Sequence, residues 1–327
     1  MSSLPEIDIR SARERLHGRV VRTPLVPAPE LSDQVGTDVY LKLESVQPTG
    51  SFKVRGATSK ILSIPEEERS LGVVTASTGN HGRAVSYVAR SLDIRATVCV
   101  SHGVPHGKLD ALHAVGATVE VVGDSQTVAL QRAHEIAEET GAAFVHPFDD
   151  PEVIAGQATI AAEVLEDLPE VASILVPLSG GGLLAGIATA LHEASVATQP
   201  IGVSMERAAV MATSLEAGKP VDLEEEPTLA DSLLGDIGLD NRYTFDIVSR
   251  LVQDVVLVDE NAIWTAMWFL FDNHRLVVEG AGAVGVAGLL MGAVVPSAGP
   301  TVLVISGANA EPSHVQALLA GNPAPTM

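Results

Sequence analysis

From residue 71 onward the sequence alternates short apolar runs with longer segments of helical periodicity. The apolar runs are rich in Val, Ile and Leu, and they span residues 72–76, 94–100, 118–122, 173–177, 201–204 and 301–305. The spacing of apolar residues indicates helices over residues 82–92, 108–115, 125–140, 155–168, 260–273 and 279–287. Short apolar strands that alternate with helices are typical of a parallel sheet covered on both faces. The alternation therefore predicts an α/β fold built on parallel sheets flanked by helices.

The alternation falls into two series, which predict two domains with a cleft between them. We assign residues 1–70 and 149–327 to a large domain, and residues 71–148 to a small domain. Ligands of open parallel sheets bind at the carboxyl ends of the strands. Functional residues are therefore expected in the turns that follow the predicted strands.

The charge balance limits the partners that the chain can bind. Asp and Glu number 41 against 20 Lys and Arg, which gives a formal net charge of -21. This acidic balance argues against nucleic acid and anionic membranes, and no apolar run approaches the roughly 20 residues that cross a bilayer. The first ten residues lack a secretory signal pattern, and the single cysteine, Cys99, cannot form an internal disulfide. We expect a cytoplasmic protein that acts on a small molecule.

A lysine follows the first predicted strand, which spans residues 38–43. Lys53 lies in the run Ser-Phe-Lys-Val-Arg-Gly-Ala at residues 51–57, at the start of a predicted helix that Thr49 or Ser51 could cap. A lysine in a dry pocket or near cationic dipoles loses proton affinity and becomes a usable amine nucleophile. A surface lysine in a polar turn is the alternative, and the local composition alone favours it.

Two turns with short polar side chains follow other predicted strands. The first contains Ser77, Thr78, Gly79, Asn80 and His81 beside a helix N-terminus, which favours an anion, although a simple capped turn has the same composition. The second spans residues 306–309 and begins with a serine whose hydroxyl could bond to a ring nitrogen. An ordinary glycine turn is the alternative there.

The turn at residues 179–183, Ser-Gly-Gly-Gly-Leu, gives a stronger signal for a phosphate. Its glycines expose backbone N–H groups between a strand and a helix. The spacing Gly180-x-Gly182-x-x-Ala185 also fits the dinucleotide fingerprint, with Glu206 as a ribose partner, so an NAD-dependent enzyme is an alternative. A reactive lysine, a phosphate site and ring-facing polar groups together favour pyridoxal 5′-phosphate (PLP), because NAD gives no role to Lys53.

Five motifs in order make the chain resemble the threonine dehydratase and serine racemase family. They are residues 51–57, 77–81, 146–150 (His-Pro-Phe-Asp-Asp), 154–157 (Ile-Ala-Gly-Gln) and 179–183. This family belongs to the PLP enzymes of fold type II, which are similar to the tryptophan synthase β chain. The resemblance covers nearly the whole chain and implies that the large domain binds PLP while the small domain faces the substrate.

The resemblance implies a role for each residue of these motifs. Lys53 would carry the cofactor, with Phe52 beside the ring, Asn80 on the phenolic oxygen and Ser306 facing the pyridine nitrogen. The phosphate would lie on the backbone of Ser179, Gly180, Gly181, Gly182 and Leu183. The substrate carboxylate would lie among Ser77, Thr78, Gly79 and His81.

The implied activity removes water and ammonia from a β-hydroxy amino acid, such as threonine, serine or 3-hydroxyaspartate, and yields a 2-oxo acid. Lys53 would take the α-proton. Because the Ser306 hydroxyl is a weak base, it would limit charge delocalisation onto the ring and favour elimination over transamination. A PLP-binding protein without turnover is the non-enzyme alternative, and the joint presence of Lys53, Asn80 and Ser306 argues against it.

Three positions depart from the family pattern. Thr78, the second candidate catalytic residue, stands where serine racemases have an acid/base serine, so elimination is favoured over racemisation. Arg83 replaces a glutamine and could pair with a second substrate carboxylate, or it could pack along the domain edge. Glu206 matches one ligand of the family's divalent metal site, but the next acidic ligand is replaced by apolar residues at 210–212, which argues against a bound ion.

Two further implications come from the resemblance. Residues 228–238, together with 204–207 and 241–245, resemble the branch of the family that is assigned to hydroxyectoine utilisation. Relatives are commonly homodimers, so a homodimer is expected here.

Overall fold

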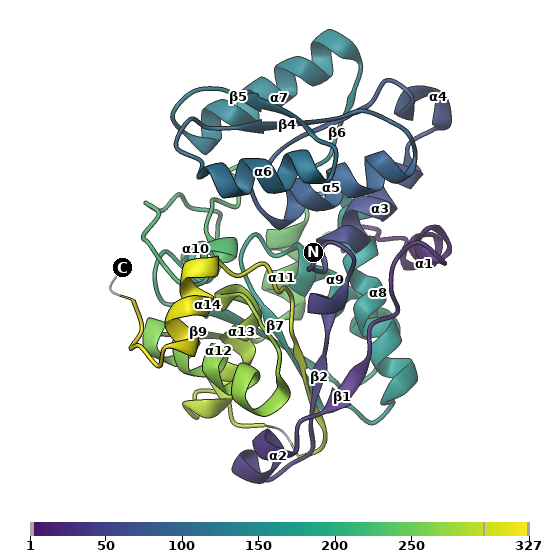
Figure 1. Ribbon diagram of the computed structural model, residues 1–327. Coiled ribbons are helices and arrows are strands. Elements are labelled where there is room, and N and C mark those ends of the chain that lie inside the picture. The colour runs from purple at the N-terminus through teal and green to yellow at the C-terminus, as the bar shows by residue number, and fades with distance from the viewer. Residues whose placement is uncertain (1–2, 297, 326–327) are drawn as a thin grey trace.

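The computed structural model describes residues 3–296 and 298–325, and it contains two sheets in two lobes (Figure 1). The larger sheet has the strand order β1-β2-β10-β7-β8-β9. Its strands are β1 (Leu25–Pro27), β2 (Val39–Lys42), β7 (Ser173–Pro177), β8 (Gln199–Met205), β9 (Asp254–Val258) and β10 (Thr301–Val304). All neighbours pair in parallel except β1 and β2, which are antiparallel. A late strand, β10, therefore lies between β2 and β7.

The smaller sheet has four parallel strands in the order β5-β4-β3-β6. They are β3 (Val73–Ala76), β4 (Ala96–Val100), β5 (Thr118–Val121) and β6 (Ala143–Phe144). These strands all come from the segment 71–148 that the sequence assigns to a small domain. The exact domain boundaries stay a prediction.

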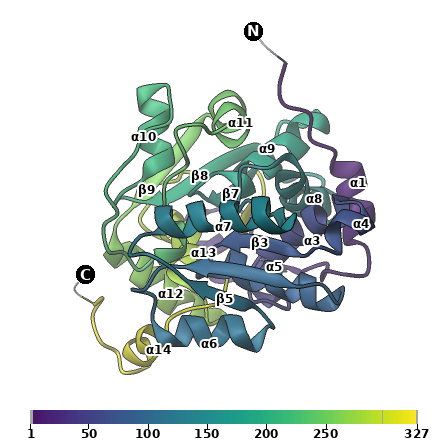
Figure 2. The ribbon, with the colours of Figure 1, turned by 90° about the horizontal axis from the view of Figure 1, so that it is seen from above.

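Helices cover both faces of the larger sheet, as Figure 2 shows from above. Alternate residues of β10 explain this packing, because Leu303 joins one apolar cluster while Val302 and Val304 join another. The first cluster includes α12 (Glu260–His274) and α13 (Gly280–Leu290). The second includes α1 (Ile9–Leu16), α8 (Pro151–Asp167), α9 (Gly182–Glu193) and α11 (Thr244–Leu251).

The smaller sheet is covered by α5 (Asn80–Ser91), α6 (His106–Ala114) and α7 (Gln126–Thr140). The helix that begins at Lys53, α3 (Lys53–Ser63), also contributes to this core, because Val54, Ala57 and Ile61 pack with α5 and β3. The remaining short helices are α2 (Pro29–Val35), α4 (Glu66–Arg69), α10 (Val210–Ala217), α14 (Pro312–Leu319), η1 (Glu44–Val46) and η2 (Asp231–Leu233).

The predicted start of α7 is confirmed, since Ser125 caps it and Gly141 ends it in the left-handed region. The predicted cap of α3 is wrong. Phe52 is the N-cap residue, and no side chain caps this helix. Ser51 instead pairs with Gly307 in an isolated antiparallel bridge, so a tertiary contact takes the place of the local one.

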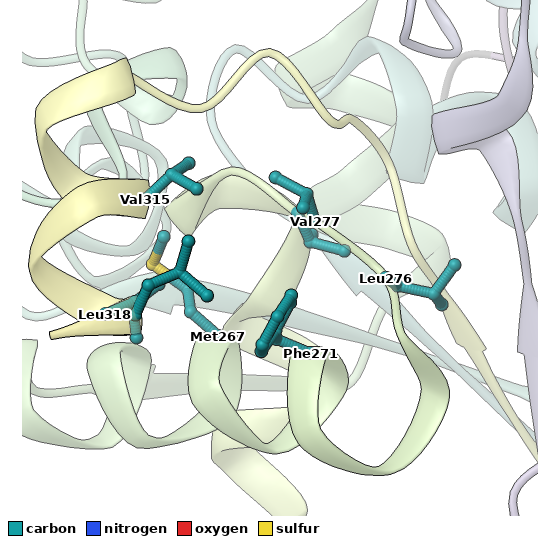
Figure 3. Close-up of a pocket in the computed structure, with 8 residues that line it drawn as sticks. Met267, Phe271, Leu276, Val277, Val315 and Leu318 are labelled. Carbon is teal, nitrogen blue, oxygen red and sulfur yellow. The ribbon is translucent and has the colours of Figure 1, made fainter. Parts of the chain in front are cut away.

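A small pocket lies between α12 and α14 (Figure 3). Met267, Phe271, Leu276, Val277, Val315 and Leu318 are among the residues that line it, and every residue that lines it is apolar. A pocket without a polar group cannot orient an amino acid, so we place the functional site elsewhere. Over residues 3–296 and 298–325, none of the helices combines the length and the apolar character that a membrane crossing requires.

Candidate active site

The strand order brings three predicted turns to one edge of the larger sheet. β2, β10 and β7 are neighbours, and their carboxyl ends lead toward Lys53, Ser306 and the turn at 179–183. Phe52 N donates to the Ser306 carbonyl at 3.0 Å, and Ala308 N donates to the Gly50 carbonyl at 2.8 Å. The lysine motif and the Ser306 turn are therefore in direct contact.

Lys53 is held in a partly apolar setting at the start of α3. Its Nζ donates to the Pro147 carbonyl at 2.7 Å and lies 5.3 Å from the centroid of the Phe52 ring. Burial lowers the pKa of Lys53 to about 8, against an opposing attraction from Glu279. A larger share of this amine is therefore neutral at physiological pH than in an ordinary lysine, as a nucleophile or proton acceptor requires.

A buried ion cluster fixes the helix that carries Lys53. Arg55 lies two residues further along α3 and is fully buried. Its guanidinium bonds to Glu44 at 2.8 Å and to Glu163 at 2.7 Å, and Lys42 Nζ bonds to Glu163 at 2.6 Å. Two cations and two carboxylates balance one another, so the desolvated charges are compensated only while all four groups stay in place.

The turn at 179–183 is formed by glycines that leave no room for a side chain. A Cβ at Gly180 would lie 2.5 Å from the Phe148 ring, and Gly181 has a φ of +86°. The helix α9 starts at Gly182 without a side-chain cap. Because no side chain caps the helix, its first backbone N–H groups are available as donors to a ligand. Such donors at a helix N-terminus fit the oxygens of a phosphate.

Asn80 begins α5 and reaches across to the larger sheet. Its Nδ2 donates to Glu279 Oε1 at 2.7 Å, and its Oδ1 accepts from Asn309 Nδ2 at 2.6 Å. Asn309 N donates to Glu279 Oε2 at 3.1 Å. Burial, and then the charge of Asp231, raises the pKa of Glu279 to about 7. This asparagine pair and the buried carboxylate join the two lobes beside Lys53.

The predicted substrate turn ends the strand β3. Ser77, Thr78 and Gly79 are half-buried, and Asn80 and His81 are buried behind them. The Nε2 of His81 lies 3.0 Å from the Val145 carbonyl, so this nitrogen must carry the proton, and the buried Nδ1 has no partner. Burial, together with the charge of Lys53, lowers the pKa of His81 to about 3. A neutral imidazole in this tautomer has no N–H left to give to a substrate carboxylate, so Ser77 and Thr78 are the better candidates.

Ser306 is buried just after the end of β10. The Ser51 hydroxyl beside it is buried without a partner. An unsatisfied buried hydroxyl is costly unless a ligand pairs with it. The buried amine of Lys53, the uncapped glycine turn at 179–183 and this unpaired hydroxyl together fit PLP.

Glu206 follows β8, the strand beside β7 in the larger sheet. Glu206 is exposed at the end of β8, where its backbone N bonds to the Val258 carbonyl. In the ranges 3–296 and 298–325, no three His, Cys, Asp or Glu side chains come together as metal ligands would. The role of Glu206 in a metal site stays a prediction that no neighbouring ligand supports.

Arg83 lies on the first turn of α5, as the sequence predicts, but it faces a protein partner. Its Nη1 donates to Asn309 Oδ1 at 2.7 Å. The guanidinium therefore spans the two lobes rather than packing along a domain edge.

A family model described as pyridoxal-phosphate dependent enzyme matches residues 17–307. The chain belongs to this family. It is 44% identical over 306 residues to the L-threonine ammonia-lyase of Geobacter sulfurreducens, covering 94% of this chain and 76% of that protein. It is 39% identical over 310 residues to the catabolic L-threonine dehydratase of Escherichia coli strain K12, covering 94% of each. The structure of maize serine racemase superposes with a TM-score of 0.91 at 32% identity over 98% of both chains.

These likenesses confirm the resemblance to PLP enzymes of fold type II and the α/β architecture with helices on both sides of parallel sheets. PLP is the cofactor of this family, so the choice of PLP over NAD is also confirmed. The roles of the individual residues stay predictions.

Sequence reasoning missed two polar residues of this PLP enzyme's site. The sequence predicts Glu279 only as the start of a helix over residues 279–287, and Asn309 only as the end of the turn at residues 306–309. A charged residue between Val278 and Gly280 in an otherwise apolar run was the available signal, because a buried carboxylate is rarely tolerated without partners.

Proposed function

We propose that the chain is a PLP-dependent dehydratase that converts a β-hydroxy amino acid into a 2-oxo acid and ammonia. The observation that carries the proposal is the Lys53 amine, held by Pro147 beside the Phe52 ring at the strand edge where the 179–183 and Ser306 turns lie. The names of the Geobacter and Escherichia coli relatives support this reaction type.

PLP, when bound, supplies the electron sink that makes the α-proton of an amino acid acidic. The chain's own groups do the rest. Lys53 Nζ, with its lowered pKa, takes the proton from the α-carbon. Ser306 Oγ would hold the pyridine nitrogen of PLP as a weak base, which would leave that nitrogen largely unprotonated and favour early loss of the β-hydroxyl.

The overall reaction balances without a further reactant. Cleavage of the bond between the β-carbon and its hydroxyl releases water, and hydrolysis of the carbon–nitrogen bond consumes water and releases ammonia. The net products from threonine are a 2-oxo acid with the same carbon chain and one ammonia. Ser77 and Thr78, at the end of β3, hold the substrate carboxylate with their hydroxyls and the nearby backbone N–H groups.

The substrate is a β-hydroxy amino acid such as threonine, serine or 3-hydroxyaspartate. The relatives named for L-threonine support threonine as the first substrate to test. A dehydratase of hydroxyectoine breakdown is a narrower form of the same proposal, and it rests on the loop at residues 228–238.

A panel assay tests the proposal. The purified protein with added PLP should release 2-oxo acid from at least one of L-threonine, L-serine and 3-hydroxyaspartate, while Lys53→Ala should release none. A wild-type protein that shows the visible band of lysine-bound PLP and releases no 2-oxo acid from the panel would instead be a PLP-binding protein without this turnover.

We also infer that the enzyme works as a homodimer in the cytoplasm. The burial of its single cysteine, Cys99, supports a protein that needs no disulfide. Gel filtration with light scattering tests the dimer.

A further inference from the structure

Four polar side chains form a continuous hydrogen-bond network between the two lobes. Arg83 Nη1 donates to Asn309 Oδ1 at 2.7 Å, and Asn309 Nδ2 donates to Asn80 Oδ1 at 2.6 Å. Asn80 Nδ2 then donates to Glu279 Oε1 at 2.7 Å. Arg83 and Asn80 lie on α5 of the small lobe, whereas Asn309 and Glu279 lie on segments of the large lobe. The network runs from a cation to a carboxylate, and each of its three hydrogen bonds crosses the interface.

The side-chain amides of Asn80 and Asn309 can each form the hydrogen bonds of this network in only one of their two orientations. If Asn80 were turned over, its carbonyl oxygen would face the Glu279 carboxylate, and its NH₂ group would face the NH₂ group of Asn309. If Asn309 were turned over, its oxygen would meet both Asn80 Oδ1 and the Thr49 carbonyl, to which Nδ2 now donates at 3.0 Å. The guanidinium of Arg83 could not then donate to Asn309, because two donors would face each other. Arg83 and the Thr49 carbonyl together select the orientation of Asn309, and Asn309 and Glu279 together select that of Asn80.

The Asn309 side chain packs directly against the backbone of Gly50. A Cβ added at Gly50 would lie 2.8 Å from Asn309 Oδ1, and Gly50 has a φ of +73°. The backbone N of Asn309 is fixed by Glu279 Oε2 at 3.1 Å. The Arg83 guanidinium adds the contact to Asn309 Oδ1 from the small lobe, on the side of the amide that the Thr49 carbonyl does not reach.

We propose that Arg83 is a positioning residue, which acts through Asn309 to hold the Asn80 amide so that its second N–H is directed at the phenolic oxygen of PLP. The inference rests on the proposed function, because it assigns to Asn80 the cofactor contact that the family resemblance implies. Arg83 then touches neither the substrate nor the cofactor, in contrast to the carboxylate-reading role that the sequence suggested.

Binding of PLP to cofactor-free protein gives a direct test that does not depend on turnover. Arg83→Met keeps the length of the side chain but removes the donor, so we expect the Kd for PLP to rise roughly 5- to 30-fold, as when one hydrogen bond to a charged group is lost. The pH midpoint of the visible band should shift upward by roughly half a unit to one unit, because a poorly held Asn80 stabilises the phenolate less well. Arg90→Met is the matched control, since Arg90 is exposed on the same helix and donates to the Ala114 carbonyl, away from the Asn309 contact.

A double-mutant cycle distinguishes action through Asn309 from a general effect of the charge. Arg83→Met should change neither the Kd nor the midpoint when it is added to Asn309→Leu. Additive effects of the two substitutions would overturn the proposal, and so would a Kd and a midpoint that are unchanged in Arg83→Met alone. If Arg83→Met leaves both values unchanged but alters the ratio of kcat/KM for 3-hydroxyaspartate and threonine, Arg83 reads the substrate. A wild-type protein that gives no visible band with PLP would contradict the proposed function itself, before the variants are compared.

Discussion

Asn80 and Glu279 are 199 residues apart in the sequence and share a 2.7 Å hydrogen bond. The contact joins the first turn of α5, at the carboxyl end of the smaller sheet, to the N-cap of α13 under the larger sheet. A buried carboxylate thus connects both lobes next to the Lys53 amine, which its charge also influences. The protonation of this one group is therefore expected to influence the stability of the whole molecule.

We expect Glu279 to make stability fall as the pH rises from about 4.5 to about 7. Its pKa is raised to about 7 in the fold from an ordinary value of 4.5, so the folded chain holds a proton that the unfolded chain has lost in this window. The free energy of unfolding of the wild type relative to Glu279→Gln should fall by on the order of 3 kcal/mol across it. Urea unfolding at several pH values measures the difference. A difference that stays constant between these pH values would show that Glu279 is ionised throughout.

The rate at which cofactor-free protein binds PLP should rise with pH and level off above about 8. Only the neutral amine of Lys53 can attack the aldehyde, and burial lowers the pKa of this amine to about 8 from 10.5. Stopped-flow absorbance gives the rate, with Lys53→Ala expected to form no visible band and the exposed Lys219→Ala expected to behave as the wild type. A rate that is still rising tenfold per unit at pH 9 would mean that Lys53 titrates as an ordinary lysine.

The lowered pKa of Lys53 predicts a change of stability with pH that is opposite in sign to the change predicted for Glu279. Folded Lys53 loses its proton at a lower pH than the unfolded residue, so the cofactor-free protein should gain stability between pH 8 and pH 10.5. Lys53→Met should lack this gain.

Elimination should dominate over inversion when L-serine is the substrate. Thr78 stands half-buried at the end of β3, and its β-methyl group restricts the rotation of the hydroxyl that a racemase would use as an acid or base. Thr78→Ser should raise the ratio of D-serine to 2-oxo acid, which chiral chromatography measures. Substantial D-serine from the wild-type protein would contradict this prediction.

The buried ion cluster around Arg55 should be essential for stability. Arg55→Met would leave Glu44 and Glu163 buried with Lys42 as the remaining cation, so we expect a loss of about 3–5 kcal/mol in the free energy of unfolding. Arg10→Met is the control, because Arg10 pairs with Glu14 on the surface and should leave the unfolding midpoint unchanged. A small effect of Arg55→Met would indicate that water enters and solvates the two carboxylates.

The sequence predicted those parts of the fold whose pattern is local. The strand β10 and the helix α7 were visible because apolar periodicity and a Ser125 cap lie within a few residues of each other. The cap of α3 was wrong because Ser51 pairs with Gly307, a residue about 250 positions away that no local pattern can indicate. The site was predicted where turns follow strands, as at Lys53 and Ser306.

Residues that act through a neighbour were harder to predict. Glu279 carries no motif of its own, and its importance depends on Asn80 and Asn309, which reach it only in three dimensions. Arg83 was noticed as unusual, but its partner could not be inferred, since side-chain spacing on α5 gives a direction without identifying what lies there.

The position of β10 in the larger sheet has a consequence for how the chain is made. The strands of the smaller sheet lie within residues 73–144 in one continuous stretch, so this lobe can assemble while the ribosome is still adding residues. β2 and β7 must wait for Thr301–Val304, because that strand separates them in the finished sheet. Until residues 301–306 emerge, β2 and β7 each leave backbone N–H and C=O groups unpaired along one edge, and Lys53 has no Ser306 turn beside it. Newly made chains should therefore acquire the ability to bind PLP only after the segment 301–306 has been made.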